Sequence, residues 1–151
     1  MNIFYLSTCP IESAQMQCDK HVVKMILETA QLLSTALHSW GFEAPYKPTH
    51  KNHPSAVWAR KSEQNFSWLS KHFEALCEEY TRRYNRIHKS SQHSAYFTAL
   101  ADYTKASTPP QCMPDDCKQP DTVQAYRQYY RIHKAYMAKW KLNNTPKWFI
   151  S

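Results

Sequence analysis

A single carboxylate stands among cations in residues 18–37, which read CDKHVVKMILETAQLLSTAL. At 100° per residue, Lys20, Lys24 and Glu28 fall on one face of a helix. A carboxylate held between cations stays ionised, and it can accept a proton or stabilise a developing cation. This spacing makes Glu28 the candidate catalytic residue, with Lys24 beside it.

The same spacing also fits a structural role. Lys24 and Glu28 are four residues apart and therefore also fit a plain surface ion pair, although Lys before Glu is the weaker order. The polar side chains occupy a stripe of about 100° on the helical wheel, and apolar residues fill the rest. The stripe consists of Lys20, His21, Lys24, Glu28, Gln31 and Thr35. Both interpretations remain open on spacing alone.

A basic segment bounded by prolines follows this helix and reads EAPYKPTHKNHP. Its cations suit phosphate contacts, and so do the cations that flank it. The candidate nucleic-acid contacts here are Lys20, His21, Lys47, His50, Lys51, Asn52, His53 and Arg60. The turn at residues 52–54 also fits a plain helix entry, in which Asn52 bonds the backbone and Pro54 sets φ.

The cysteine and histidine spacings are unlike those of known zinc sites. We considered His50 with His53, Cys112 with Cys117, and the set Cys9, Cys18 and His21. None of these patterns is specific, and a Cys–His nucleophile has no further support. The sequence therefore predicts no metal and no cofactor.

Composition favours a basic, helical protein. The chain has 151 residues, which suggests one domain, 1–151, and its formal charge of +7 favours an anionic partner, most often nucleic acid. A soluble basic protein without such a partner fits equally well. The one glycine argues against an all-β fold and against glycine-rich phosphate loops. Five cysteines and an N-terminus without a leader or membrane span indicate reduced thiols in the cytoplasm.

The elements that must position these residues are predicted to be helices. We expect an all-α bundle with helices near 11–38, 54–87 and 121–141, the first broken near residues 18–19. Ser62 is a candidate cap within the second range, and Asp121 with Gln124 forms a candidate capping box. Residues 2–6 fit either a strand or an extended arm. Residues 93–103 fit a short helix, and residues 107–121 a loop.

Three segments, taken in order, resemble the pyrimidine-dimer DNA glycosylase family of the endonuclease V type, found in phages and bacteria. They are CDKHVVKMILETAQLL, THKNHPSAVW and ALCEEYTRR. The resemblance covers roughly residues 1–90. The tail TPKWF is similar to the aromatic, basic C-terminus of the phage enzyme, which adds Lys147 and Trp148 as candidate DNA contacts.

The resemblance implies a compact all-α DNA-repair enzyme in which Glu28 matches the catalytic glutamate and Lys24 a basic residue before it. Residues 52–54 match an Asn-His-Pro turn. Members of this family use the N-terminal α-amine as nucleophile, and the resulting imine permits strand cleavage by β-elimination. An α-amine has a pKa near 7.7–8, so a useful fraction is neutral at pH 7. A phage-encoded protein of this kind would work in the host cytoplasm.

The sequence departs from the family at the nucleophile. The phage enzyme exposes threonine after methionine removal, whereas here Asn2 follows Met1, and a residue as large as Asn usually leaves methionine in place. Three alternatives follow: the Met1 amine is the nucleophile, Glu28 activates water and the lyase step is lost, or the fold acts on another nucleotide substrate. A fourth, of a different class, is a non-catalytic module that binds nucleic acid or a host protein. Catalysis predicts that Glu28, Lys24 and the turn at 52–54 face one pocket.

Overall fold

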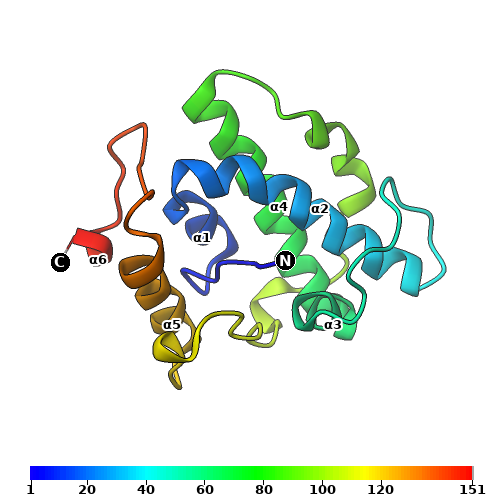
Figure 1. Ribbon diagram of the computed structural model, residues 1–151. Coiled ribbons are helices and arrows are strands. Elements are labelled where there is room, and N and C mark those ends of the chain that lie inside the picture. Colours follow the sequence, from blue (N-terminus) through cyan, green and yellow to red (C-terminus); the bar gives the residue numbers. More distant parts are fainter. Residues whose placement is uncertain (151) are drawn as a thin grey trace.

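Helices organise the whole chain in the computed structural model, which describes residues 1–150 (Figure 1). The α-helices are α1 (Pro10–Met16), α2 (Asp19–Ser39), α3 (Pro54–Lys61), α4 (Glu63–Tyr84), α5 (Thr122–Tyr129) and α6 (Lys147–Ile150). Short 3₁₀ helices are η1 (Lys89–Phe97), η2 (Tyr103–Lys105) and η3 (Asp115–Cys117), and η4 (Tyr130–Lys134) is a π-helical turn. Residues 1–150 contain no strand, which confirms the all-α prediction.

The helix predicted at 11–38 is broken where expected. Gln17 and Cys18 have extended backbone, and α2 begins at Asp19. Its end follows from Gly41, whose φ of 84° lies in the left-handed region. The amide of Phe42 donates to the carbonyl of Leu37 at 2.9 Å and the amide of Gly41 to that of His38 at 3.0 Å. This pair of bonds is a Schellman motif, which explains why α2 stops there.

The range predicted at 54–87 is two helices rather than one, as the candidate cap at Ser62 indicated. Ser62 is extended, with φ −155° and ψ 158°, and its hydroxyl accepts from the amide of Asn65 at 3.0 Å. Helix α4 then ends before Asn85, which adopts a left-handed conformation with φ 53°. The prediction is therefore wrong at its C-terminal end.

The helix predicted at 121–141 is too long. The Asp121 carboxylate caps α5 by accepting from the amide of Gln124 at 3.2 Å, as predicted. The α-helix then gives way to η4, and the chain leaves the helix before Trp140. The Trp140 indole N–H donates to the carbonyl of Met16 at 3.0 Å. This long-range contact draws Trp140 away from the helix axis. The periodicity of the local sequence does not reveal such a contact, so the predicted helix was too long.

The short helix predicted at 93–103 is confirmed only over residues 93–97, which belong to η1, and is wrong after them. The amides of Leu100 and Ala101 both donate to the hydroxyl of Ser67 on α4, at 2.7 and 2.8 Å. Because these amides bond to α4, residues 98–102 are irregular between η1 and η2.

Residues 2–6 form the extended arm rather than a strand, and the arm runs through the middle of the molecule (Figure 1). Its residues Ile3, Phe4, Tyr5 and Leu6 are all buried in the core. The hydroxyl of Ser13 on α1 accepts from the amide of Leu6 and donates to the carbonyl of Phe4, so the arm is fixed to α1. Helix α4 packs against α1, α2 and α3 beneath it.

The faces of α2 differ from the helical-wheel prediction. His21 and Thr35, expected in the polar stripe, are buried, whereas Val23 and Leu27 are 41 % and 40 % exposed. The Thr35 hydroxyl bonds both the amide and the carbonyl of Thr49, because the loop after α2 folds back over this side of the helix. No helix within residues 1–150 is long and apolar enough to cross a membrane.

Candidate active site

The N-terminus lies in a cavity of about 380 Å³, which we call the amine cavity. It is lined by Met1, Asn2, Phe4, His21, Lys24, Met25, Glu28, His53, Cys112, Tyr129 and Lys134. The α-amine of Met1 lies 3.6 Å from Oε1 of Glu28, and Lys24 Nζ lies 3.8 Å from Oε2. The Met1 side chain is 3 % exposed and that of Glu28 17 %, whereas Lys24 is 73 % exposed. Glu28 is therefore paired with two cations, the exposed Lys24 ammonium and the amine of Met1, a residue that is partly exposed.

Asn2 holds the first residue in place. Its Oδ1 accepts from the amides of Ile3 and Phe4, at 2.8 and 3.1 Å, and its Nδ2 donates to the carbonyl of Cys112 at 2.9 Å. Phe4 takes a left-handed φ of 57°, which turns the chain from the core toward the cavity. These bonds fix the backbone at residue 2 and so aim the amine at Glu28.

His53 reaches the amine cavity from the start of α3. Its Nδ1 accepts from the amide of Ser55 at 3.0 Å, so His53 caps α3 and supplies the side-chain bond that we predicted for Asn52. Burial, the N-terminal charge and His50 lower the pKa of His53, while Glu28 opposes this. Because Nδ1 is an acceptor, a neutral His53 carries its proton on Nε2, where it can act as a donor.

His21 forms part of the cavity wall as a neutral ring. It stacks on Phe4 with ring centroids 4.0 Å apart, and its Nδ1 lies 2.6 Å from the hydroxyl of Tyr130. Burial first, and then the charges of Lys134 and Lys24, lower the pKa of His21 to about 3. His21 therefore brings no positive charge to the cavity near neutral pH.

A second cavity, of about 340 Å³, lies beside Thr35 of α2, and we call it the basic cavity. Its lining consists of Thr35, His38, Ser39, Pro48, Lys51 and Arg60. The Arg60 guanidinium donates to the carbonyl of Lys51 at 2.6 Å, which ties α3 to the loop. Three other predicted contacts, Lys47, His50 and Asn52, are exposed on this loop, and Lys20 is exposed at the start of α2.

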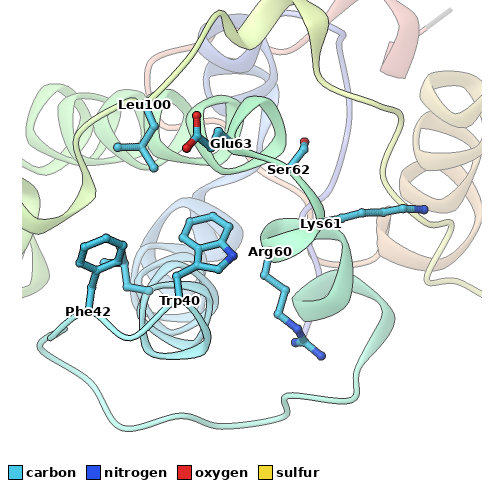
Figure 2. Close-up of a pocket in the computed structure, with 8 residues that line it drawn as sticks. Trp40, Phe42, Arg60, Lys61, Ser62, Glu63 and Leu100 are labelled. Atoms are coloured by element: carbon cyan, nitrogen blue, oxygen red, sulfur yellow. The ribbon is translucent and has the colours of Figure 1, made fainter.

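Arg60 also lines a third cavity, of about 530 Å³, so this cavity adjoins the basic cavity. Figure 2 shows Trp40, Phe42 and Leu100 on its apolar side, with Arg60 and Lys61 beside them. The pair Leu37 and Phe42, which closes the Schellman motif, forms part of this lining. Sequence spacing did not indicate this aromatic site, because Trp40 and Leu100 are brought together only by the fold.

Lys147 and Trp148 lie elsewhere. They belong to α6, which packs beside α5 and lies far from α3 in Figure 1. The guanidiniums of Arg127 and Arg131 lie 5.3 and 5.9 Å from the centre of the Trp148 ring, and Arg131 donates to the Trp148 carbonyl at 2.9 Å. The fold therefore does not bring these two residues to the amine cavity.

The fold adds wall residues that the sequence analysis missed. Asn2, Cys112, Tyr129 and Lys134 line the amine cavity, and three of them come from beyond residue 107. No motif of known spacing joins these positions, so only the fold identifies them. Cys18 and His21 each contact the Tyr130 hydroxyl and do not form a Cys–His pair.

The structure is thus a basic, all-α protein in which the N-terminal amine faces a glutamate in a cavity. Residues 1–92 match the family model for pyrimidine dimer DNA glycosylase. This match covers more than half of the chain, which therefore belongs to that family, a class of DNA-binding repair glycosylases. The matched segment includes Met1, Lys24, Glu28 and His53. No curated protein and no solved structure matches the chain.

Proposed function

We propose that this protein is a glycosylase acting on damaged or modified pyrimidines in DNA, with the Met1 amine as nucleophile and Glu28 as the catalytic carboxylate. The observation that carries this proposal is the α-amine of Met1, 3.6 Å from Oε1 of Glu28, at the wall of an open cavity. The convergence of Glu28, Lys24 and His53 on that cavity supports it, because a solvated surface pair needs no such surroundings.

The proposed reaction begins with the fraction of the Met1 amine that is neutral near pH 7, after its proton has passed to solvent, so Glu28 stays ionised. The amine attacks C1′ of the damaged nucleotide, and the glycosidic bond breaks with its electron pair leaving on the base. Positive charge develops on the sugar in this step, and the Glu28 carboxylate stabilises it. Lys24 is a positioning residue here, since its ammonium lies 3.8 Å from Oε2 of Glu28, whereas the reacting amine faces Oε1.

A lyase step follows from the same intermediate. As the sugar ring opens, the C1′–O4′ electron pair stays on O4′, which takes up a proton as the nitrogen loses one. A protonated imine then joins Met1 and C1′. A base then removes a proton from C2′, and the 3′ phosphate leaves with the C3′–O electron pair. Glu28 Oε1 lies 3.6 Å from the amine, so Glu28 is our candidate for this proton transfer.

DNA is proposed to lie along the exposed start of α2, the loop after α2 and the start of α3. Lys20, Lys47 and Lys51 supply phosphate contacts there, with His50, Asn52 and Arg60 beside them. The Nε2–H of His53 provides a donor at the edge of the amine cavity. Lys147 and Trp148 remain a predicted second contact region on the α6 side.

Borohydride trapping tests the proposal directly. Duplex DNA carrying a pyrimidine dimer, an abasic site or a modified pyrimidine is incubated with untagged protein and reduced. Trypsin then separates the two candidate amines, because Met1 lies in the peptide 1–20 and Lys24 beyond it. We expect the sugar on the peptide 1–20 and no trapping by a protein extended by one alanine before Met1.

The other outcomes separate the alternatives. Base release without trapping would assign Glu28 to water activation and remove the lyase step. Binding without base release from any substrate would favour the non-catalytic module, and a product from a different nucleotide substrate would redirect the specificity.

A further inference from the structure

Three side chains of the kinds that bind metal ions lie together in the part of the chain after residue 92, which the family model does not match. Asp116 and Cys117 belong to η3, and His133 belongs to η4. His133 Nε2 lies 3.0 Å from each carboxylate oxygen of Asp116, and Cys117 Sγ lies 3.5 Å from Asp116 Oδ1. All three donor atoms lie within 4.8 Å of one another.

These separations are close to the edges of a zinc tetrahedron. With Zn–S near 2.3 Å and Zn–N and Zn–O near 2.0 Å, tetrahedral angles place sulfur and oxygen about 3.5 Å apart and nitrogen and oxygen about 3.3 Å apart. The observed sulfur–oxygen distance is 3.5 Å and the nitrogen–oxygen distances are 3.0 Å. The third edge, between Cys117 Sγ and His133 Nε2, is at most 4.8 Å and would close toward about 3.5 Å around an ion.

We propose that Asp116, Cys117 and His133 form a Zn²⁺ site with a fourth position open to water. One thiolate, one imidazole and one carboxylate are a donor set that zinc accepts. Without metal, the ion pair between Asp116 and His133 and the hydrogen bond from the Cys117 thiol to Asp116 Oδ1 hold these donor atoms together, and an ion would replace both contacts.

The cation next to the site along the chain does not occupy the Asp116 carboxylate. The nearby Lys118 ammonium is paired with Asp115 at 3.1 Å, so it leaves Asp116 available.

The position of the site gives zinc a structural role. The edge of the His133 ring faces Tyr129, with ring centroids 5.9 Å apart, and both Tyr129 and Lys134 line the amine cavity. Zinc would therefore fasten the loop that carries η3 to the segment that forms one wall of that cavity. This inference does not rest on the proposed reaction.

Metal binding to the untagged, chelator-treated protein tests the site. We expect one Zn²⁺ per chain in a competition titration against a chromophoric chelator. Co²⁺ should give a thiolate-to-metal charge-transfer band in the near ultraviolet. Saturating Zn²⁺ should raise the melting temperature by about 5 °C.

The variants Asp116→Asn, Cys117→Ser and His133→Gln should each weaken Zn²⁺ binding at least about tenfold. Cys117→Ser should also abolish the charge-transfer band. Asp116 and His133 are partly exposed, so those two variants are expected to fold even if the buried cysteine variant does not. Cys9→Ser and His93→Gln are the matched controls and should bind Zn²⁺ normally. Absence of stoichiometric binding, or undiminished binding in Asp116→Asn and His133→Gln, would overturn the proposal.

Discussion

The α-amine of Met1 and Oε1 of Glu28 lie 3.6 Å apart, although the two residues are separated by the arm, all of α1 and the first half of α2. The arm makes this contact possible by carrying residue 1 back across the core to the face of α2. An amine and a carboxylate so placed can exchange a proton without moving the backbone. The reactivity of the pair is expected to depend on the amine, on the carboxylate and on the Asn2 hydrogen bonds that hold the first residue in place.

Replacing Glu28 with Gln keeps the shape of the side chain and removes its charge. We expect base release and trapping to fall about 10²–10⁴-fold, as for loss of a general acid–base group. DNA binding should survive or improve, because one negative charge near the phosphates is gone. Single-turnover kinetics and a binding titration measure the two effects. Glu74→Gln, which removes the carboxylate of the exposed pair with Lys71, should change neither.

Asn2→Gln lengthens the side chain that holds the first residue, while the large side chain still leaves methionine in place. We expect a loss of trapping rate of about tenfold or more, since displacing a reacting group by 1 Å can cost about 10²-fold. The intact mass checks that Met1 is retained. Unchanged trapping with intact Met1 would show that the three Asn2 hydrogen bonds do not position the amine.

Reversing charge at Lys47 and Lys51 probes the proposed DNA surface. The Lys47→Glu, Lys51→Glu double variant should bind duplex DNA about tenfold or more weakly and show a shallower dependence of affinity on salt. A double variant at Lys71 and Lys105, on α4 and η2, carries the same charge change and should bind nearly normally. If instead Lys147→Glu with Trp148→Ala has the larger effect, the DNA surface lies on the α6 side.

Near its C-terminal end, α4 carries a buried ion network, and removing a charge from it should strongly lower the stability of the fold. Glu79 and Arg83 are 1 % and 0 % exposed and are joined by a 2.8 Å bond, and Arg83 also reaches Asp19 at 3.1 Å. Glu79→Gln leaves the Arg83 charge short of a partner and should lower the free energy of unfolding by about 3–5 kcal/mol. Glu74→Gln should cost less than about 1 kcal/mol in the same urea titration.

Two buried histidines predict acid sensitivity. Burial lowers the pKa of His72 to about 4 and that of His21 to about 3. Between these values and the ordinary pKa of 6.5, the unfolded chain binds more protons than the folded one, so stability falls as pH falls. The stability contribution is complete above about pH 6.5.

His72→Gln should make the pH dependence of unfolding shallower by about 1.4 kcal/mol per pH unit between roughly pH 4.5 and 6. Urea midpoints across that range measure the slope. His93→Gln, at a partly exposed position, should leave it unchanged.

Local patterns predicted the elements that local bonds define. Ser62 and Asp121 act as caps because a hydroxyl or carboxylate can bond an amide two or three residues ahead. The polar stripe likewise placed Lys24 beside Glu28. Prediction from periodicity was wrong where a backbone amide bonds to a distant segment. The amide of Leu100, for example, donates to the hydroxyl of Ser67 on α4.

The candidate site was predictable only in part for the same reason. Glu28 stands out because few carboxylates occur on an apolar helix, and the family resemblance adds Met1. The contact from Asn2 to Cys112 joins residues 110 positions apart, and no local pattern encodes it. The sequence motif identified His53 as a site residue, but the side-chain bond at the start of α3 was predicted for Asn52. In the structure, the Nδ1 atom of His53 accepts this bond from the amide of Ser55.

A nucleophile that is the first backbone nitrogen has an unusual genetic property. Every translated chain has such a nitrogen, so no substitution of a side chain can delete the group itself. Loss of the proposed Met1 nucleophile itself must come from chemistry at the terminus, such as acetylation, or from a change in where the chain starts. One added residue would move the amine by about 3.8 Å, so recombinant versions of this protein should carry affinity tags only after residue 151.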